Sequence, residues 1–414
     1  MLVAQPELSG ADIWAAAAAG DTSAVAGFLE TDPASVNRPG PHGWTPLYCA
    51  CYSRIPESAG RSTYEAAKLL LAHGADAKTF TLKNNDPPGS ELARRFTALT
   101  GTFGGGSTGL ANQPPHPRWR ELAELLLTHG ADPADRWALW INPAASLEIL
   151  LRHGLASDVA LTGRELCRAA REDRAELVRL LLSHGADTAA EFESKTPWRH
   201  AMEGGNLAIA RMLEEAGASV EELSDVSLLQ SLVLSGDETG ARALLERVPD
   251  LLSRAPQYLV NKAAGTGRVE AARLAIGLGF DADCLDEVAP LHIAAGRGDV
   301  AMVRFLLSRG ASPRIREPFY DATPVGWADF FDQTATRDLL LDEGAVCLFD
   351  ALDYDRADLI PSILARDPAA LQRPFAECLT RPARPEDGET PLARMVARGR
   401  DDLSALLRQR GAQL

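Results

Sequence analysis

Histidine is the most versatile chemical group in this chain of 414 residues, because imidazole can exchange a proton near neutral pH or ligate a metal. Four of its eight histidines stand directly before a glycine at the end of an apolar run: His73, His129, His153 and His184. This recurrence predicts a structural role, in which the imidazole hydrogen-bonds to backbone at a helix end. His292 receives the same interpretation. His42, His116 and His200 lack such a position, and His42 and His116, with Arg118, are the candidate acid–base groups.

Other constellations that resemble catalytic or ligand sites are incomplete. Residues 101–109 read GTFGGGSTG, but no lysine follows, as a phosphate-binding P-loop requires, so a flexible loop is the stronger interpretation. Four aspartates lie close together without the spacing or glycine of a calcium loop: Asp350, Asp353, Asp355 and Asp358. They predict a solvated face. Cys49 and His42 have no third group to orient the histidine. No catalytic motif is found, and we expect no metal and no cofactor.

Charge and cysteine usage restrict the classes of partner. Fifty-seven acidic against 42 basic residues give a formal net charge of -15, which repels phosphate backbones and argues against nucleic acid as a partner. The six cysteines form no CxxC pair, so reduced thiols are expected rather than a zinc site or disulfides. The first residues, MLVAQPELSG, lack a targeting pattern, and the early apolar run at 13–19 is too short to span a membrane. We expect a cytoplasmic protein without a membrane partner.

The elements that must position these residues repeat along the chain. Segments such as LLLAHGADA, LLLTHGADP, LLLSHGADT and FLLSRGASP recur, and clean neighbouring copies are about 31 to 34 residues apart, which is the period of a helix–turn–helix array. In the copy at 289–313, Pro290 suits the first turn of a helix. Val303, Leu306 and Leu307 form the apolar face of a second helix. Gly310 is expected to end that helix in the left-handed conformation.

This copy resembles the ankyrin repeat, whose T-P-L-H-x-A motif is matched by APLHIAA at 289–295 and TPLYCAC at 45–51. Looser matches begin at Thr196, Thr323 and Thr390. The resemblance implies an all-α ankyrin-repeat solenoid of about 11–12 helix pairs, with an inserted loop in the N-terminal third. Scarce lysine and abundant alanine further suggest a GC-rich, bacterial coding sequence.

Departures from the period set the expected organisation. We predict an N-terminal capping unit over 1–40 and ankyrin repeats over 41–222, interrupted by an insertion at 78–118. Degenerate repeats follow over 223–264, and further repeats with a C-terminal cap occupy 265–414. Within the insertion, a first helix is expected at 97–101 and a Gly- and Pro-rich loop at 104–117. Such loops often map to the binding face of a repeat array.

The resemblance also implies a binding face, built from the loop before each first helix and from the end of that helix. Carried over repeat by repeat, it gives eight candidate binding residues: His42, Trp44, Tyr52, Phe96, Arg297, Phe319, Tyr320 and Phe330. Exposed aromatic and arginine side chains are the types that anchor interfaces. Burial between repeats stays open for Phe96 and Phe331. Three tryptophans are expected in the core: Trp137, Trp140 and Trp198.

Three functions follow from these observations. The first is a cytosolic binding protein that presents a concave aromatic and acidic groove to a protein or peptide partner, with a basic partner favoured by charge. The second is a small-molecule enzyme, of cyclase or hydrolase type, with its site under the 78–118 insertion. The third is an antitoxin- or immunity-type inhibitor whose acidic charge blocks a basic active site. The N-terminal half, around His42, Trp44 and Tyr52, is the expected location.

Overall fold

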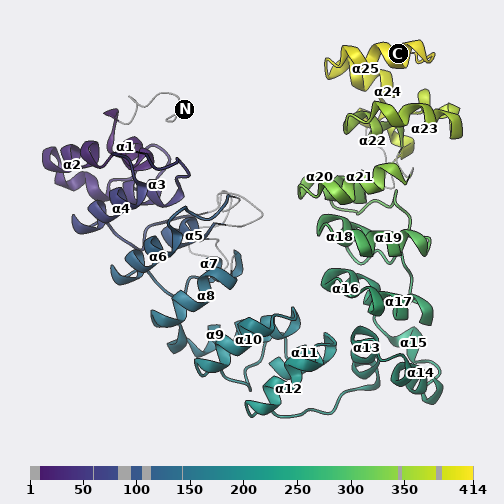
Figure 1. Ribbon diagram of the computed structural model, residues 1–414, viewed down its shortest axis with the longest axis horizontal. Coiled ribbons are helices and arrows are strands. Elements are labelled where there is room, and N and C mark those ends of the chain that lie inside the picture. The colour runs from purple at the N-terminus through teal and green to yellow at the C-terminus, as the bar shows by residue number, and fades with distance from the viewer. Residues whose placement is uncertain are drawn as a thin grey trace. The chain divides into compact units, whose positions relative to one another are not determined.

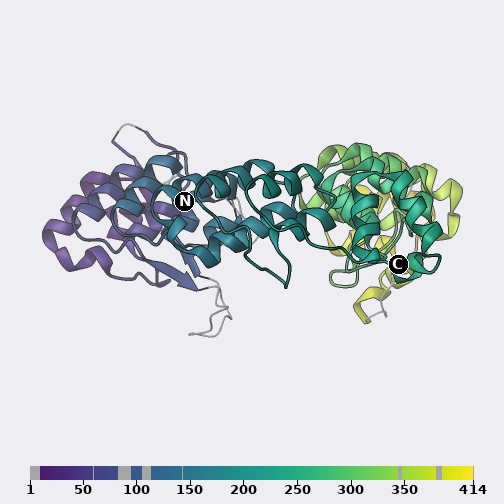
Figure 2. The same cartoon turned by 90° about the horizontal axis from the view of Figure 1, so that it is seen from below.

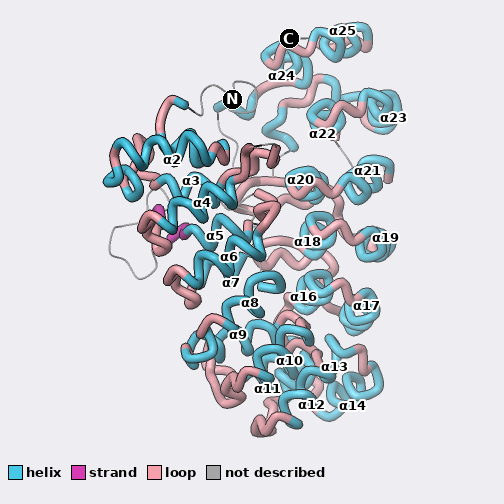
Figure 3. The backbone as a smooth tube through the Cα atoms, turned by 60° about the vertical axis from the view of Figure 1, so that its left-hand side comes forward, coloured by secondary structure: helices cyan, strands magenta, loops and turns pink. Residues whose placement is uncertain are grey.

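The computed structural model describes residues 10–58, 60–82, 95–104, 113–141, 143–343, 347–378 and 385–413. Contacts divide the chain into two compact units. Unit 1 consists of Met1–Ala169 with Arg174–Thr196, and unit 2 of Ala170–Asp173 with Pro197–Leu414. The described residues are predominantly helical, with one pair of short strands (Figure 3). The helices form twelve successive pairs, so the predicted all-α, ankyrin-like repeat solenoid is confirmed (Figure 1).

Unit 1 is built from the first five helix pairs. They are α1 (Ile13–Ala19) with α2 (Thr22–Thr31), α3 (Pro46–Tyr52) with α4 (Thr63–Ala72), α5 (Ala98–Phe103) with α6 (Trp119–Thr128), α7 (Arg136–Ile141) with α8 (Pro143–Arg152), and α9 (Val159–Arg171) with α10 (Ala175–Ser183). Strands β1 (Phe80–Leu82) and β2 (Arg95–Thr97) pair antiparallel and lie along one side of the helices (Figure 2). These strands were not predicted. The helix expected at 97–101 is present as α5, and residues 105–112 of the expected loop lie outside the described residues.

Unit 2 contains the remaining seven pairs. They are α11 (Pro197–Glu203) with α12 (Leu207–Glu215), α13 (Asp225–Ser235) with α14 (Glu238–Arg247), α16 (Leu259–Thr266) with α17 (Val269–Leu278), α18 (Pro290–Gly296) with α19 (Val300–Ser308), α20 (Pro324–Phe330) with α21 (Thr334–Asp342), α22 (Leu348–Asp353) with α23 (Ile360–Arg366), and α24 (Pro391–Ala397) with α25 (Asp401–Gln409). The short helix α15 (Leu251–Arg254) lies between α14 and α16. First helices pack on first helices, as α18 does on α20. Second helices pack on second helices, as α19 does on α21 (Figure 1).

Four of the described first helices begin where threonine precedes proline: α3, α11, α20 and α24. The Thr45 hydroxyl accepts a hydrogen bond from the N–H of Tyr48 at 3.3 Å, and Pro46 occupies the first turn of α3. Thr323 caps α20 in the same way. A capping hydroxyl satisfies one of the backbone donors that a helix start leaves unpaired, and proline has no such donor to lose. The TP dipeptides therefore place the start of these four helices directly after their loops.

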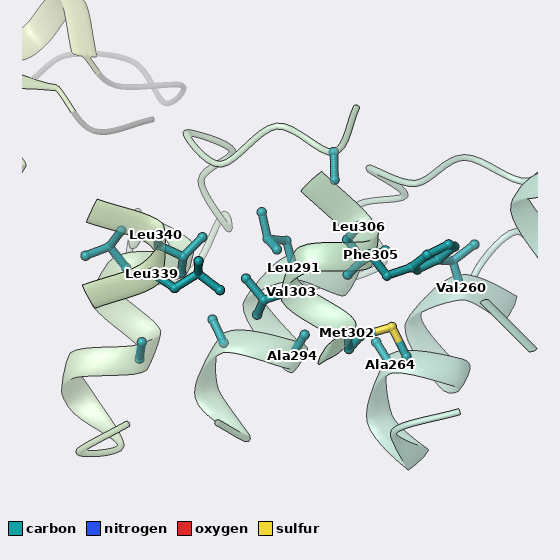
Figure 4. Packing of buried hydrophobic residues seen from close by; sticks show 14 of the residues in the cluster. Val260, Ala264, Leu291, Ala294, Met302, Val303, Phe305, Leu306, Leu339 and Leu340 are labelled. Carbon is teal, nitrogen blue, oxygen red and sulfur yellow. The ribbon is translucent and has the colours of Figure 1, made fainter. Parts of the chain in front are cut away.

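The core of unit 2 is continuous from one repeat to the next. Figure 4 shows Met302 and Val303 of α19 among side chains of the neighbouring repeats, including Val260 and Ala264 of α16. Ala294 of α18 is fully buried in the same cluster, and its small side chain permits the close approach of first helices. Each helix pair thus buries its apolar face on its neighbours rather than in a separate core, as repeat arrays do.

Two glycines allow the cost of a left-handed backbone to be separated from the cost of a steric clash. Gly310 ends α19 at φ +86°, as predicted, and a Cβ there would meet no heavy atom within 4 Å. Gly205 has φ +68°, but its Cβ would lie 2.5 Å from the Leu234 carbonyl carbon. We expect Gly310→Ala to lower the free energy of unfolding by about 1–2 kcal/mol, and Gly205→Ala by clearly more because α13 must move. Urea denaturation measures both, and equal losses would contradict the clash.

Candidate partner-binding surface

The loop before α20 holds two large aromatic side chains in solvent. Phe319 is 68% exposed and Tyr320 is 85% exposed. Directly before them, Glu317 is only 1% exposed, and its carboxylate accepts the N–H groups of Phe319 at 2.7 Å, Tyr320 at 3.0 Å and Ala322 at 3.1 Å. Hydrogen bonds to a charged acceptor are stronger than neutral ones. Glu317 therefore holds the backbone of the loop in one conformation while both rings point outward.

A buried arginine secures the same loop from its other side. Arg316 is 7% exposed, donates from Nε to the Cys378 carbonyl at 2.9 Å, and donates from Nη1 to the Asp321 carbonyl. It also forms an ion pair with the Asp321 carboxylate at 3.7 Å. Asp321 itself has φ +55°, a backbone conformation that aspartate tolerates better than most residues. The loop is thus attached to the body of unit 2 at several points.

A second pair of exposed aromatic rings lies at the end of α20. Phe330 is 73% exposed and Phe331 is 39% exposed, and their rings meet edge to face with centroids 5.0 Å apart. Phe331 also lies 5.8 Å from the ring of Trp327. A Cβ at Gly296 of α18 would lie 3.0 Å from the Phe331 ring, so glycine is needed for this close contact. Phe331 rests on the neighbouring repeat and supports Phe330, which projects into solvent.

His292 joins the two repeats that carry these rings. Its Nε2 donates to the Ala322 carbonyl at 2.9 Å, and its ring lies 5.7 Å from Trp327. Burial lowers the pKa of His292, which favours the neutral imidazole. The backbone role predicted for His292 is confirmed. Equivalent bonds to helix carbonyls are made by three of the histidines that precede glycine: His73, His129 and His184. His153 instead bonds to the carboxylate of Glu124.

We call the five residues Arg297, Phe319, Tyr320, Phe330 and Phe331 the aromatic surface. Arg297, at the end of α18, is exposed like the rings. Exposed carboxylates occur in the same two repeats: Asp332 directly follows Phe331, and Asp286 and Glu287 belong to the loop before α18. Large apolar side chains gathered on a surface mark interaction sites more often than scattered ones do. The surface therefore combines exposed rings with negative charge.

The candidates of unit 1 are arranged differently. His42 is exposed, Trp44 and Tyr52 are both half-buried, and Tyr52 lies at the end of a row of stacked rings. Ring centroids are 6.0 Å apart between His42 and Trp44, 5.5 Å between Trp44 and Tyr48, and 4.2 Å between Tyr48 and Tyr52. The Tyr52 hydroxyl donates to the Thr97 carbonyl at 3.0 Å. Tyr52 thus joins two repeats and offers little surface to a partner.

Phe96 requires a correction, because it is 4% exposed rather than on a surface. It is the middle residue of β2, pairs with Thr81, and its ring lies 6.2 Å from that of Trp137. Side chains alternate between the two faces of a strand, so Arg95 is exposed where Phe96 is buried. The unpredicted hairpin explains the difference. Trp198 is buried as expected, Trp137 is half-buried, and the Trp140 side chain lies outside the described residues.

His116 and Arg118 have structural partners instead of an acid–base arrangement. His116 is fully buried, and its Nδ1 accepts the N–H of Arg118 at 3.1 Å. Because Nδ1 is the acceptor, Nε2 carries the proton and donates to the Thr63 hydroxyl at 2.7 Å. Desolvation, aided by Arg54, lowers the pKa of His116 to about 4. The Arg118 guanidinium lies 3.8 Å from the Tyr64 ring centroid and ion-pairs with Glu65. Both residues join α4 to the start of α6.

The lowered pKa of His116 makes stability depend on pH. The pKa of His116 is near 6.5 in the unfolded chain and about 4 in the folded chain. At pH values between these two, His116 is protonated in the unfolded chain but neutral in the folded chain. The contribution of neutral His116 to the free energy of unfolding is therefore fully present above pH 6.5. It decreases by up to about 3 kcal/mol as the pH falls toward 4. We expect His116→Gln to be less stable than the parent at pH 7 and to approach it at pH 4.5. A constant difference in unfolding free energy would contradict this assignment.

The four clustered aspartates are engaged individually. Asp350 accepts the N–H of Cys347 at 3.0 Å, and Asp353 pairs with Arg394 and Arg398. The remaining two also bind arginines, with Asp355 pairing with Arg400 and Asp358 with Arg356. Among the described residues, no group of three or more His, Cys, Asp or Glu side chains is placed to hold a metal ion. The cluster is an ion-paired face.

Comparison with known families agrees with the architecture. The family model of the ankyrin repeat matches residues 42–81 and 286–317. The first match contains α3 and α4, and the second contains α18 and α19 and ends at Glu317, beneath the aromatic surface. None of the described helices combines the length and apolar character needed to cross a membrane. Two matched repeats within a stack of helix pairs of the same design support an ankyrin-repeat protein.

Proposed function

We propose that this chain is a binding protein whose aromatic surface receives a basic segment of a protein partner. Ankyrin repeats are protein-interaction modules, which supports a binding role in general. The observation that carries the proposal is the loop around Glu317. A buried carboxylate is costly unless it is well satisfied, and here it serves to hold two rings in solvent. That arrangement attaches the loop to unit 2 and at the same time keeps Phe319 and Tyr320 in solvent, where a partner can contact them.

Charge and ring chemistry indicate a basic partner. The chain carries a net charge of -15, and exposed carboxylates occur in the same two repeats as the rings, at Asp286, Glu287 and Asp332. Arginine and lysine side chains bind to the faces of aromatic rings while their charge is neutralised by nearby carboxylates. The loop is already ordered by Glu317 and Arg316, so binding costs little conformational entropy. An inhibitor acting on a basic active site would use the same surface and differs only in the identity of its partner.

Selection from a library of short random peptides displayed on phage tests the proposal with the full chain as bait. We expect enriched sequences to combine arginine or lysine with an apolar residue, and to lose binding to the double variant Tyr320→Ala/Phe330→Ala. The matched control is Val220→Ala, which trims an apolar side chain that is 67% exposed elsewhere in unit 2. Enriched peptides that are acidic, or that bind the double variant as well as the parent, would overturn the proposal. Loss of binding in Trp44→Ala alone would place the site in unit 1.

A further inference from the structure

A cavity of about 200 Å³ in unit 2 brings two cysteines together. Its lining includes Cys347, Phe349, Ile363 and Cys378, together with arginines 366 and 373. Cys347 immediately precedes α22, whereas Cys378 ends a short 3-10 helix (Phe375–Cys378) that follows α23. The two cysteines therefore stand at opposite ends of one helix pair, and the fold returns the chain to bring them side by side.

The thiols of Cys347 and Cys378 are within hydrogen-bonding reach of each other, and both residues are half-buried. Their backbones are held independently. Asp350 accepts the N–H of Cys347 at 3.0 Å, and Arg316 donates to the Cys378 carbonyl at 2.9 Å. Neither of these two contacts uses a sulfur atom, and the Cys347 sulfur additionally accepts the N–H of Asp350 at the start of α22.

The electrostatic surroundings divide the pair into a nucleophile and a proton donor. The hydrogen bond from Cys347, with the positive charges of Arg316 and Arg373, lowers the pKa of Cys378 to about 7, although burial and Asp350 act in the opposite direction. The same hydrogen bond, with burial, raises the pKa of Cys347. By contrast, burial raises the pKa of Cys49 and of Cys51 to about 12. The thiolate is the reactive form of cysteine, so Cys378 differs in reactivity from the buried thiols of unit 1.

We propose that Cys378 and Cys347 form an oxidation site at which a hydroperoxide converts the thiol pair into a disulfide. The Cys378 thiolate attacks one peroxide oxygen, the O–O bond breaks, and Cys378 becomes a sulfenic acid while the other oxygen leaves, protonated, as water or an alcohol. The Cys347 sulfur then attacks the Cys378 sulfur, the S–O bond breaks, and the hydroxyl leaves with the Cys347 proton as water. With hydrogen peroxide, two thiols and one peroxide give one disulfide and two waters. The site does not depend on the partner proposed above.

Peptide mapping after treatment of the full chain with hydrogen peroxide tests the site directly. We expect a Cys347–Cys378 link to be the first product. In Cys347→Ser, oxidation should stop at a sulfenic acid on Cys378, which a 1,3-dione reagent traps. In Cys378→Ser, loss of free thiol should slow by about tenfold or more, because burial raises the pKa of Cys49, Cys51 and Cys284 and leaves little of the reactive thiolate.

Cys284→Ser is the matched control, since Cys284 is also half-buried but burial raises its pKa. This variant should oxidise at the parent rate. A first product that joins other cysteines, or a Cys378→Ser variant that oxidises as fast as the parent, would overturn the proposal. Peptide mapping of the parent chain identifies the first disulfide without any substitution, so a variant that folds poorly does not prevent the test.

Discussion

Replacing Tyr320 and Phe330 together with alanine should weaken binding of a basic peptide by about 30-fold or more, with little change in the stability of the chain. The two side chains are 85% and 73% exposed, so their removal leaves no cavity in the core. Truncation of one such key aromatic residue in an interface costs about 2 kcal/mol or more, which corresponds to about 30-fold in affinity. Isothermal titration with a peptide from the selection measures the affinity, and urea denaturation measures the stability.

Two further variants separate the rings from the loop that holds them. Glu317→Ala leaves Phe319 and Tyr320 in place but removes the acceptor of their N–H groups, and it should weaken binding because the loop must then be ordered by the partner. Arg297→Ala removes a positive charge from the surface, and it should strengthen binding of a basic peptide slightly.

The affinity for a basic peptide should fall as the salt concentration rises, because salt screens an acidic surface. A double variant that binds with unchanged affinity would exclude the aromatic surface as the contact.

Replacing Arg394 with alanine should destabilise the C-terminal repeats by about 2–3 kcal/mol, because it removes a buried guanidinium that packs between two rings and pairs with two partly exposed carboxylates. Arg394 is 7% exposed and lies between two rings, with its guanidinium carbon 3.9 Å from the Phe375 centroid and 4.7 Å from the Phe349 centroid. It pairs with Asp353 at 3.0 Å and with Glu389 at 2.6 Å. Hydrogen exchange should show the largest loss of protection in α22 and α24.

Arg398→Ala is the matched control, because Arg398 binds the same carboxylate. Its Nη1 lies 2.8 Å from Asp353, as close as the Arg394 contact, but its side chain is 50% exposed. Water screens such a pair, so its loss should cost no more than about 1 kcal/mol. If both substitutions lower the free energy of unfolding by the same amount, burial of the arginine does not decide the strength of these ion pairs.

The sequence alone determined the repeat architecture. Short-range patterns encode it: TP dipeptides begin first helices, apolar residues at helical spacing form second helices, and glycine ends them. Gly310 has the left-handed backbone that its position after FLLSR predicts, and His292 makes the backbone contact that its recurring motif predicts. Most of these features are local, since they depend on residues within one helix pair, whereas the His292 contact joins one repeat to the next. They also recur, so each copy supports the interpretation of the others.

Only the tertiary structure decided which aromatic residues are available to a partner. Tyr52 and Phe330 hold similar positions at the ends of first helices, yet Tyr52 stacks on Tyr48 while Phe330 projects into solvent. Phe96 is buried because an unpredicted hairpin turns it inward. The role of Glu317 and the meeting of Cys347 with Cys378 were likewise not visible in the sequence. Such outcomes depend on contacts between residues far apart in the chain, in segments that break the repeat, so no periodic pattern encodes them.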